Sequence, residues 1–315
     1  ISYTAFEVAD QTFTGTTTLD GAVVINESSA DVDFRVESNG NANMLFVEGG
    51  NNRVGIGTNI PTDTLNVQAA AAGTAITIVE SSDSGSNPAA FIGYRSRGTD
   101  LSGHTAIQAS NTMSQFSAGA HDGSAFAVGS KILSTASQTW TTSAHGTRLG
   151  IFTTPDGSTT PVERMRIDSS GAVTMPSQPA FLVQPASAQE NIAVNTSVAV
   201  VFGTERFDQG GDFSGNSFTA PVTGKYQLNV GMYLNNVPAN APYVELSFIT
   251  SNRNYSAGIF SSADAHTYFG LHHSGILTDM DAGDTAYIAI VQGGASSTQQ
   301  ADIQVGTFFS GYLVA

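Results

Sequence analysis

Apolar residues in this chain alternate with polar ones over short runs, and no window of useful length repeats them at the spacing of a helix. Clusters of Asn, Gly, Ser and Asp separate the runs and favour turns. The Ala run at 69–72 has helical propensity, but Gly73 and the β-branched residues that follow it oppose a helix. We therefore predict an all-β protein.

The strand-like runs fall into three segments. In 1–67 they are four or five residues long and too short to fold as a lone sheet, which predicts a trimeric β-shaft of hairpins. Segment 68–176 is predicted to be a small β knob domain whose end, ERMRIDSSGAVTMP (163–176), repeats the strand, turn, strand and proline order of 44–61. Segment 177–315 has about eight strands at short spacing, typical of a jelly-roll β-sandwich.

The stretch RVGIG (53–57) alternates apolar residues with glycine. Glycine weakens a strand, so its repeated use indicates that another backbone comes very close. In a trimeric shaft, Gly55 and Gly57 would let three backbones approach the axis while Val54 and Ile56 fill the seam between them. The alternative interpretation is a bulge or loop in a monomeric sheet.

Composition narrows the function classes. Charged residues make up 12% of the chain, against about 25% in average proteins, and the net charge is −15, so nucleic acid and anionic membranes would be repelled. The absence of cysteine excludes a disulfide scaffold, a cysteine zinc site and a thiol nucleophile. No apolar run approaches the roughly 20 residues that span a bilayer, so we expect no membrane insertion.

The third segment resembles the globular head shared by the complement C1q and tumour-necrosis-factor families. The resemblance rests on FDQGGDFSGNSFTAPVTGKYQLNV (207–230), AGDTAYIAIV (282–291) and the closing FFSGYLV (308–314). Within the first stretch the matching residues are Phe207, Phe213, Gly215, Phe218, Pro221, Gly224 and Tyr226. The cysteines and the collagen stem of animal members are absent, so the resemblance implies the fold of the head and not a complement role.

The first two segments resemble phage tail fibres. The phrases are RVGIGTNIP (53–61), DGSAFAVGSKI (122–132), TWTTSAHGTRLGIFTTPDG (139–157) and ERMRIDSSG (163–171). Both resemblances imply a homotrimer around one axis. Because the chain begins at Ile1 and not at Met, we expect that other virion tail proteins attach through a missing N-terminal part.

No catalytic constellation stands out, so we predict that the protein is not an enzyme. No cofactor is implied beyond a divalent cation such as calcium. Carboxylates at Asp279, Asp281 and Asp284 would bind a hard cation or lie solvated in a turn. His272 and His273 point to opposite faces of a predicted strand, so only one of them could join a ring of three imidazoles on a trimer axis. The alternative is one surface and one packed histidine.

Candidate receptor contacts are aromatic and basic residues in polar segments of the third domain, where they give large area and specific hydrogen bonds. They are Tyr243, Arg253, Tyr255, His266 and Tyr268. Aromatic faces also suit sugar rings. Each could equally be an ordinary surface residue.

These features predict a structural, receptor-binding tail fibre in the virion tail. Its head would contact a host cell-surface receptor, a glycan or a protein, by avidity from three identical sites. One alternative is a secreted or cell-surface fibrous adhesin or filament subunit of the same trimeric build. Another is a virion decoration protein in which the head serves only as a trimerisation clamp.

Overall fold

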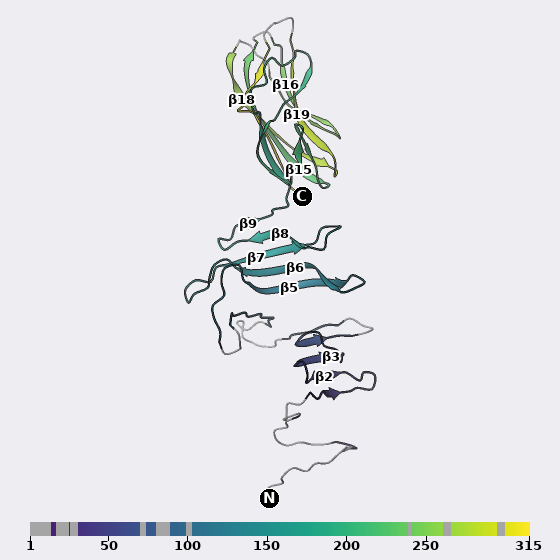
Figure 1. Ribbon diagram of the computed structural model, residues 1–315. Helices are drawn as coiled ribbons and strands as arrows, with labels where there is room; N and C mark the ends of the chain where they lie inside the picture. The colour runs from purple at the N-terminus through teal and green to yellow at the C-terminus, as the bar shows by residue number, and fades with distance from the viewer. Residues whose placement is uncertain are drawn as a thin grey trace. The chain divides into compact units, whose positions relative to one another are not determined.

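A computed structural model gives the fold. The residues that it describes are 14–16, 25, 31–69, 74–79, 89–98, 103–238, 241–260, 266–294 and 300–315, without the side chains of 260 and 266–272. These residues form strands and contain no helix, so the predicted all-β class is confirmed, and none of them belongs to a helix that could span a membrane (Figure 1). The chain divides into two compact units, 1–92 and 93–315.

The first unit holds a four-stranded sheet. Strands β1 (Phe34–Val36), β2 (Leu45–Glu48) and β3 (Arg53–Ile56) pair antiparallel, and β4 (Leu65–Val67) lies parallel to β3. Asn52 adopts a left-handed conformation in the β2–β3 turn, as asparagine does more easily than most residues. The hairpin expected around Asp20-Gly21 lies outside the described residues.

The second unit begins with a five-stranded antiparallel meander, shown in teal in Figure 1. Its strands are β5 (Thr112–His121), β6 (Phe126–Ala136), β7 (Thr147–Thr153), β8 (Val162–Ile167) and β9 (Val173–Thr174). The predicted unit at 163–176 is the β8–β9 hairpin, and the Asp168 carboxylate holds its turn by accepting from the amides of Ser170 and Ala172.

Residues 180–313 form a jelly-roll sandwich of two sheets, called the head below. One sheet has the order β12 (Thr204–Gln209), β10 (Ala180–Gln184), β21 (Phe308–Leu313), β15 (Gly224–Val237) and β18 (His266–Met280), with β20 (Asp302–Ile303) beside β15. The other has the order β13 (Phe213–Ser214), β14 (Ser217–Thr219), β19 (Thr285–Gln292), β16 (Val244–Thr250) and β17 (Asn254–Phe260), with β11 (Ser197–Ala199) beside β19.

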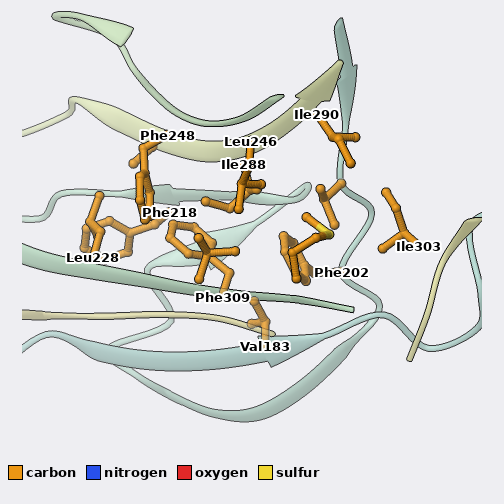
Figure 2. Packing of buried hydrophobic residues seen from close by; sticks show 14 of the residues in the cluster. Val183, Phe202, Phe218, Leu228, Leu246, Phe248, Ile288, Ile290, Ile303 and Phe309 are labelled. Atoms are coloured by element: carbon orange, nitrogen blue, oxygen red, sulfur yellow. The ribbon is translucent and has the colours of Figure 1, made fainter. Parts of the chain in front are cut away.

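The main hydrophobic core lies between the two sheets of the head. Alternate residues of the central strands point inward, as in VELSFIT of β16, where Val244, Leu246 and Phe248 are buried. Phe309 from β21 lies at the centre of an aromatic cluster that includes Phe181. Figure 2 shows Phe309 among other buried residues of this core. Its other aromatic neighbours are Phe202, Phe213 and Phe248.

The core explains the stretch that resembles the C1q and tumour-necrosis-factor heads. Phe213, Phe218 and Tyr226 are all buried, and the Tyr226 hydroxyl donates to the Val222 carbonyl at 2.7 Å. Burial raises the pKa of Tyr226 and outweighs that hydrogen bond; the nearby Asp212 charge adds to the increase. A Cβ at Gly224 would lie 2.7 Å from the carbonyl oxygen of Ala315, so the close approach of the C-terminus requires glycine. Phe207, by contrast, is half exposed.

The four sheets fall inside the three predicted segments, whose exact boundaries stay a prediction. The sequence also predicts strands at AITIVE (75–80), AAFIGYRS (89–96), TAIQAS (105–110) and QTWTTSA (138–144). These predictions are wrong, because the described parts of the four runs pair only through single bridges or not at all. The prediction missed β5, since its Ser, Gly and Ala residues give weak alternation; β6 supplies its pairing.

Candidate functional site

The head has two ends that differ in what they hold. At the entry end the chain comes in beside its own last strand, where the Leu313 amide donates to the Pro179 carbonyl. The turn at 281–284 lies at this end, since the Gly283 amide donates to Ala220 just before β15 begins. The opposite end is where β15 finishes, at Val237, and where β16 begins, at Val244.

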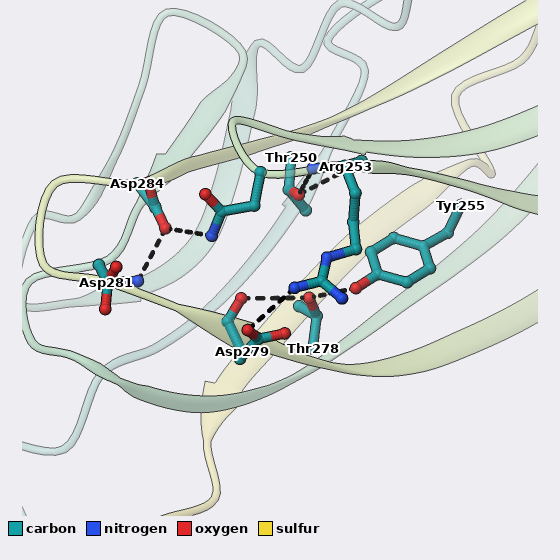
Figure 3. A network of polar contacts seen from close by, with 8 residues as sticks. Thr250, Arg253, Tyr255, Thr278, Asp279, Asp281 and Asp284 are labelled. Atoms are coloured by element: carbon teal, nitrogen blue, oxygen red, sulfur yellow. Dashed lines mark hydrogen bonds and ion pairs between the residues drawn. The ribbon is translucent and has the colours of Figure 1, made fainter.

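Two receptor candidates, Arg253 and Tyr255, lie at the entry end in a polar network (Figure 3). The Arg253 guanidinium makes an ion pair with Asp279 at 3.0 Å. Tyr255 was expected in a polar loop, which is wrong. It lies in β17, packs against the core and hydrogen-bonds through its hydroxyl to Thr278 at 2.9 Å. Its ring is therefore mainly a structural contact in the single chain.

Asp284 ties two turns together in the same network. Its carboxylate accepts from the Ser251 hydroxyl at 2.7 Å, from the Asn252 amide group at 2.6 Å and from the Asp281 backbone amide at 2.7 Å. The Ser251 hydrogen bond first, and then those from Asp281 and Asn252, lower the pKa of Asp284. The carboxylate is thus committed to protein donors.

The metal candidates do not gather into a cation site in the described part of the chain. There, no three His, Asp or Glu side chains lie in an arrangement that could hold a metal ion. Asp279 faces Arg253, and Asp281 joins the network through its backbone amide. His272 and His273 are neighbours on β18, opposite Met232 and Gly231 of β15, and the exposed His273 ring lies 5.6 Å from Phe308.

The other receptor candidates belong to the opposite end. His266 pairs with Val237 and Tyr268 with Asn235 in the β15–β18 ladder. Tyr243 immediately precedes β16; its carbonyl accepts from the Gly293 amide, and a Cβ at Gly293 would lie 2.3 Å from its ring. The five candidates therefore divide between two ends and do not form one site.

The shaft glycines are explained within one chain. A Cβ at Gly55 would lie 2.2 Å from the Thr58 carbonyl oxygen, because the 57–64 connection folds back over that face of the sheet. Gly57 has a φ of 80°, and a Cβ there would lie 2.0 Å from the Gln68 carbonyl oxygen. The close backbone is thus the chain's own, and the axial position of Val54 to Gly57 stays a prediction.

The other face of the first sheet is apolar, and no described segment of the first unit covers it. The pairing places two rows of four apolar residues across its strands, which we name the first apolar face: Phe34, Val47, Val54, Leu65 and Val36, Leu45, Ile56, Val67. None of the eight is buried, and Leu65 is 57% exposed. Four strands with one bare apolar face lack the second layer that a stable domain needs.

The meander of the second unit has a similar apolar face, which the alternation along the sequence did not predict. The register aligns Phe116, Ile132, Ile151 and Met165 across four strands, and Leu149, Ile167 and Val173 in the next row; these seven are the middle apolar face. Phe116 is 76% exposed, and no described segment of the second unit covers the row. The opposite face carries Glu163 with Arg166, and Lys131 over the Phe152 ring. The alternation of apolar and polar residues in RLGIFTT and ERMRI indicates that each strand has an apolar side. Only the pairing of the strands aligns these sides into one face.

No protein-family model matches the chain, and no curated protein matches it. Among solved structures, it is similar to the globular domain of zebrafish complement 1qA, with 18% identity, a TM-score of 0.33, and coverage of 44% of this chain and 98% of that one. Murine APRIL at pH 8.5 shares 14% identity at a TM-score of 0.32, with 44% and 99% coverage. The carboxy-terminal domain of the bacteriophage T5 L-shaped tail fibre shares 16% identity at 0.35, with 54% and 66% coverage. The fold assignment rests on the sheet orders given above.

Proposed function

We propose that this chain is part of a homotrimeric, non-enzymatic phage tail fibre whose head contacts a host cell-surface receptor. The fibre-like phrases at 53–61, 122–132 and 163–171 support the virion assignment, and the jelly roll supports the assignment of 180–313 as a head. The sheets that precede the head would give reach and stiffness.

The observation that carries the assembly is the pair of bare apolar faces. Soluble monomers rarely leave contiguous apolar surface of this kind exposed. The two faces lie in separate sheets, and each is built from Val, Ile, Leu and a few Phe or Met residues without a charge. A second copy of the chain has the same two apolar faces in the same order along the sequence. Contact between matching faces would therefore bring no charged residue against an apolar one, although each chain carries a net charge of −15.

The proposed receptor contact lies at the opposite end of the head. Tyr243, His266 and Tyr268 belong to that end, whereas Arg253 and Tyr255 are bonded to Asp279 and Thr278 at the entry end. A weak contact repeated on three heads at fixed spacing would bind a cell surface by avidity.

Native mass spectrometry tests the assembly. Three chains of 32.6 kDa (3 × 32.6 = 97.8) should give about 98 kDa. Phe116→Asp should shift the mass towards one chain, because it places a charge on the middle apolar face. Gln115→Asp, at the preceding residue and on the opposite face, should leave the mass unchanged. A wild-type mass near 32.6 kDa would overturn the proposal.

The same fold also suits a secreted or cell-surface adhesin, and localisation separates the two functions. Immunogold electron microscopy with antibody raised to residues 177–315 should label the tails of virus particles. Label on cell envelopes or free filaments, with particles unlabelled, would contradict the tail-fibre assignment and favour the adhesin. Label on the body of the particle would favour a decoration protein.

A further inference from the structure

A hollow beside Trp140 joins three segments of the second unit. Its two parts, of about 420 and 510 Å³, both border Arg95, Ser96 and Thr105, so they lie beside each other. One part is walled by Trp140 and His145 and the other by Arg97, and the volumes lie within the range of small-ligand sites. None of these residues belongs to the head or to the apolar faces.

Hydrogen bonds hold the walls of the hollow in place. The backbones of Arg97 and Thr105 bond to each other in both directions, and the Trp140 amide donates to Ile107 at 3.1 Å. The Trp140 indole Nε1 donates to the Gly146 carbonyl at 3.2 Å, and its ring is tilted against His145 with 4.7 Å between centroids. The ring is therefore fixed before any ligand arrives.

The polar side chains of the wall are also oriented. The Arg95 guanidinium donates to the Thr112 carbonyl, which anchors the arginine to the first residue of β5. The Ser96 hydroxyl hydrogen-bonds to His104 Nδ1 at 2.8 Å. The wall thus presents cations, a hydroxyl and an aromatic ring from a preformed surface, which reduces the ordering that a ligand would require.

The charge of the hollow is opposite to that of the chain. The chain has 26 acidic and 11 basic residues, yet the described residues that line the hollow include two arginines and a histidine and no carboxylate. The ion pairs among described residues involve Arg35, Arg166 and Arg253, so no carboxylate of the described residues forms an ion pair with Arg95 or Arg97. At 0.15 M ionic strength screening acts within about 8 Å, so a ligand in the hollow would experience these local cations more than the net charge.

We propose that this hollow binds a carboxylate-bearing saccharide. The face of the Trp140 indole supplies a flat apolar area for one face of a sugar ring. Its Nε1 stays hydrogen-bonded to the Gly146 carbonyl meanwhile. Guanidinium groups bind carboxylates through paired, charge-assisted hydrogen bonds. Ser96 and Thr105 add hydroxyl groups suited to sugar hydroxyls. The site rests on the proposed function only in taking its ligand from a cell surface, and it would be a second contact, separate from the head.

Trp140 is the only tryptophan of the chain, so its fluorescence reports this site directly. The full chain is titrated with oligogalacturonate, with maltotriose as a neutral saccharide and with inorganic phosphate. Oligogalacturonate should change the emission saturably, and maltotriose and phosphate should not. If oligogalacturonate and maltotriose change the emission equally, the ligand does not need a carboxylate and the proposal is overturned. If phosphate gives a saturable change at least as large as that with oligogalacturonate, the site binds a simple anion and not a saccharide.

Two arginine variants of equal charge control the titration. Arg97→Gln should weaken oligogalacturonate binding by about tenfold or more, the loss typical of a hydrogen bond to a charged group. Arg206→Gln removes the same charge from the head, where Arg206 donates to Gln184, and should bind as the wild type does. Equal dissociation constants for the two variants would overturn the site. Native mass measured on the same samples reports the trimer separately, so failure of the site and failure of the fibre assembly are distinguishable.

Discussion

At the scale of single residues, glycines and polar turn residues set the local geometry. Gly55 and Gly57 make room for the chain's own carbonyls at Thr58 and Gln68. Asp284 and Asp168 each hold a turn by accepting several hydrogen bonds, and in both cases these bonds lower the carboxyl pKa. Asp212 shows the opposite effect, since partial burial first and then the charge of Asp208 raise its pKa.

Gly57→Ala should destabilise the first sheet by about 1–3 kcal/mol, the usual cost of a strained backbone position. The new Cβ would combine a positive φ with a clash against Gln68. The change in stability is measured by unfolding in urea, with limited proteolysis within 31–69 as the readout. Gly40→Ala is the control, because its Cβ meets nothing within 4 Å. Equal stability of the two variants would contradict the role of Gly57.

Asp284→Asn should lower stability at neutral pH and have less effect in acid. The pKa of Asp284 in the folded state lies below its usual 3.8, so its contribution is complete above about pH 3.8 and is lost as the pH falls through the folded value. Free energies of unfolding at several pH values test this. Asp281→Asn removes the same charge from the same turn. Its effect on the free energy of unfolding should not depend on pH in this way, because the Asp281 carboxylate does not accept these hydrogen bonds.

At the scale of elements, strand pairing turns modest alternation into faces. The ladder from β5 to β8 aligns Phe116, Ile132, Ile151 and Met165 although they are far apart in sequence. In the head, the same alternation fills the space between two sheets, with Phe309 at the centre of the ring contacts. Strands with the same alternation therefore form a closed core in the head and an open apolar face in the meander.

Phe309→Ala should destabilise the head by about 3–5 kcal/mol, the range for removing a buried aromatic ring. Phe309 is fully buried, and its ring lies against those of Phe181, Phe202, Phe213 and Phe248, so its removal leaves a cavity at the centre of the cluster. Thermal unfolding followed by near-ultraviolet circular dichroism measures it. Val201→Ala, at a half-exposed position, should cost far less; a comparable loss would mean that the cluster is loosely packed.

At the scale of the whole molecule, charge and assembly oppose each other. A trimer would carry 3 × −15 = −45, so mutual repulsion between chains should weaken it at low salt. Added salt screens this repulsion, while burial of the apolar faces is less affected. Ionic strength should therefore favour the trimer up to physiological values.

Calcium should stabilise the protein no more than sodium chloride at equal ionic strength. Asp284 is occupied by three donors and Asp279 by Arg253, so a cation at this turn would have to displace them. Thermal denaturation in the two salts measures the difference. A larger shift with calcium that disappears in Asp279→Asn would restore the cation site suggested by the sequence.

The β class and the aromatic order of the head could be predicted from the sequence alone, because alternation and turn residues are local properties, whereas the division into three domains stays a prediction. It identified the β8–β9 hairpin by its repeat but missed β5, whose Ser, Gly and Ala residues show little pattern. It grouped Tyr243, Arg253 and Tyr255 as recognition residues, yet Arg253 and Tyr255 lie at the other end of the head from Tyr243.

Contacts between distant residues depend on the tertiary fold. The register of distant strands created the middle apolar face, and the meeting of 95–97, 104–107 and 140–146 created the cationic hollow around Trp140. Neither is written in a local pattern, because each depends on contacts between residues far apart in the chain. Likewise, alternation showed that Val54 and Ile56 share a face, but the fold showed that this face is bare and that the chain itself covers the other.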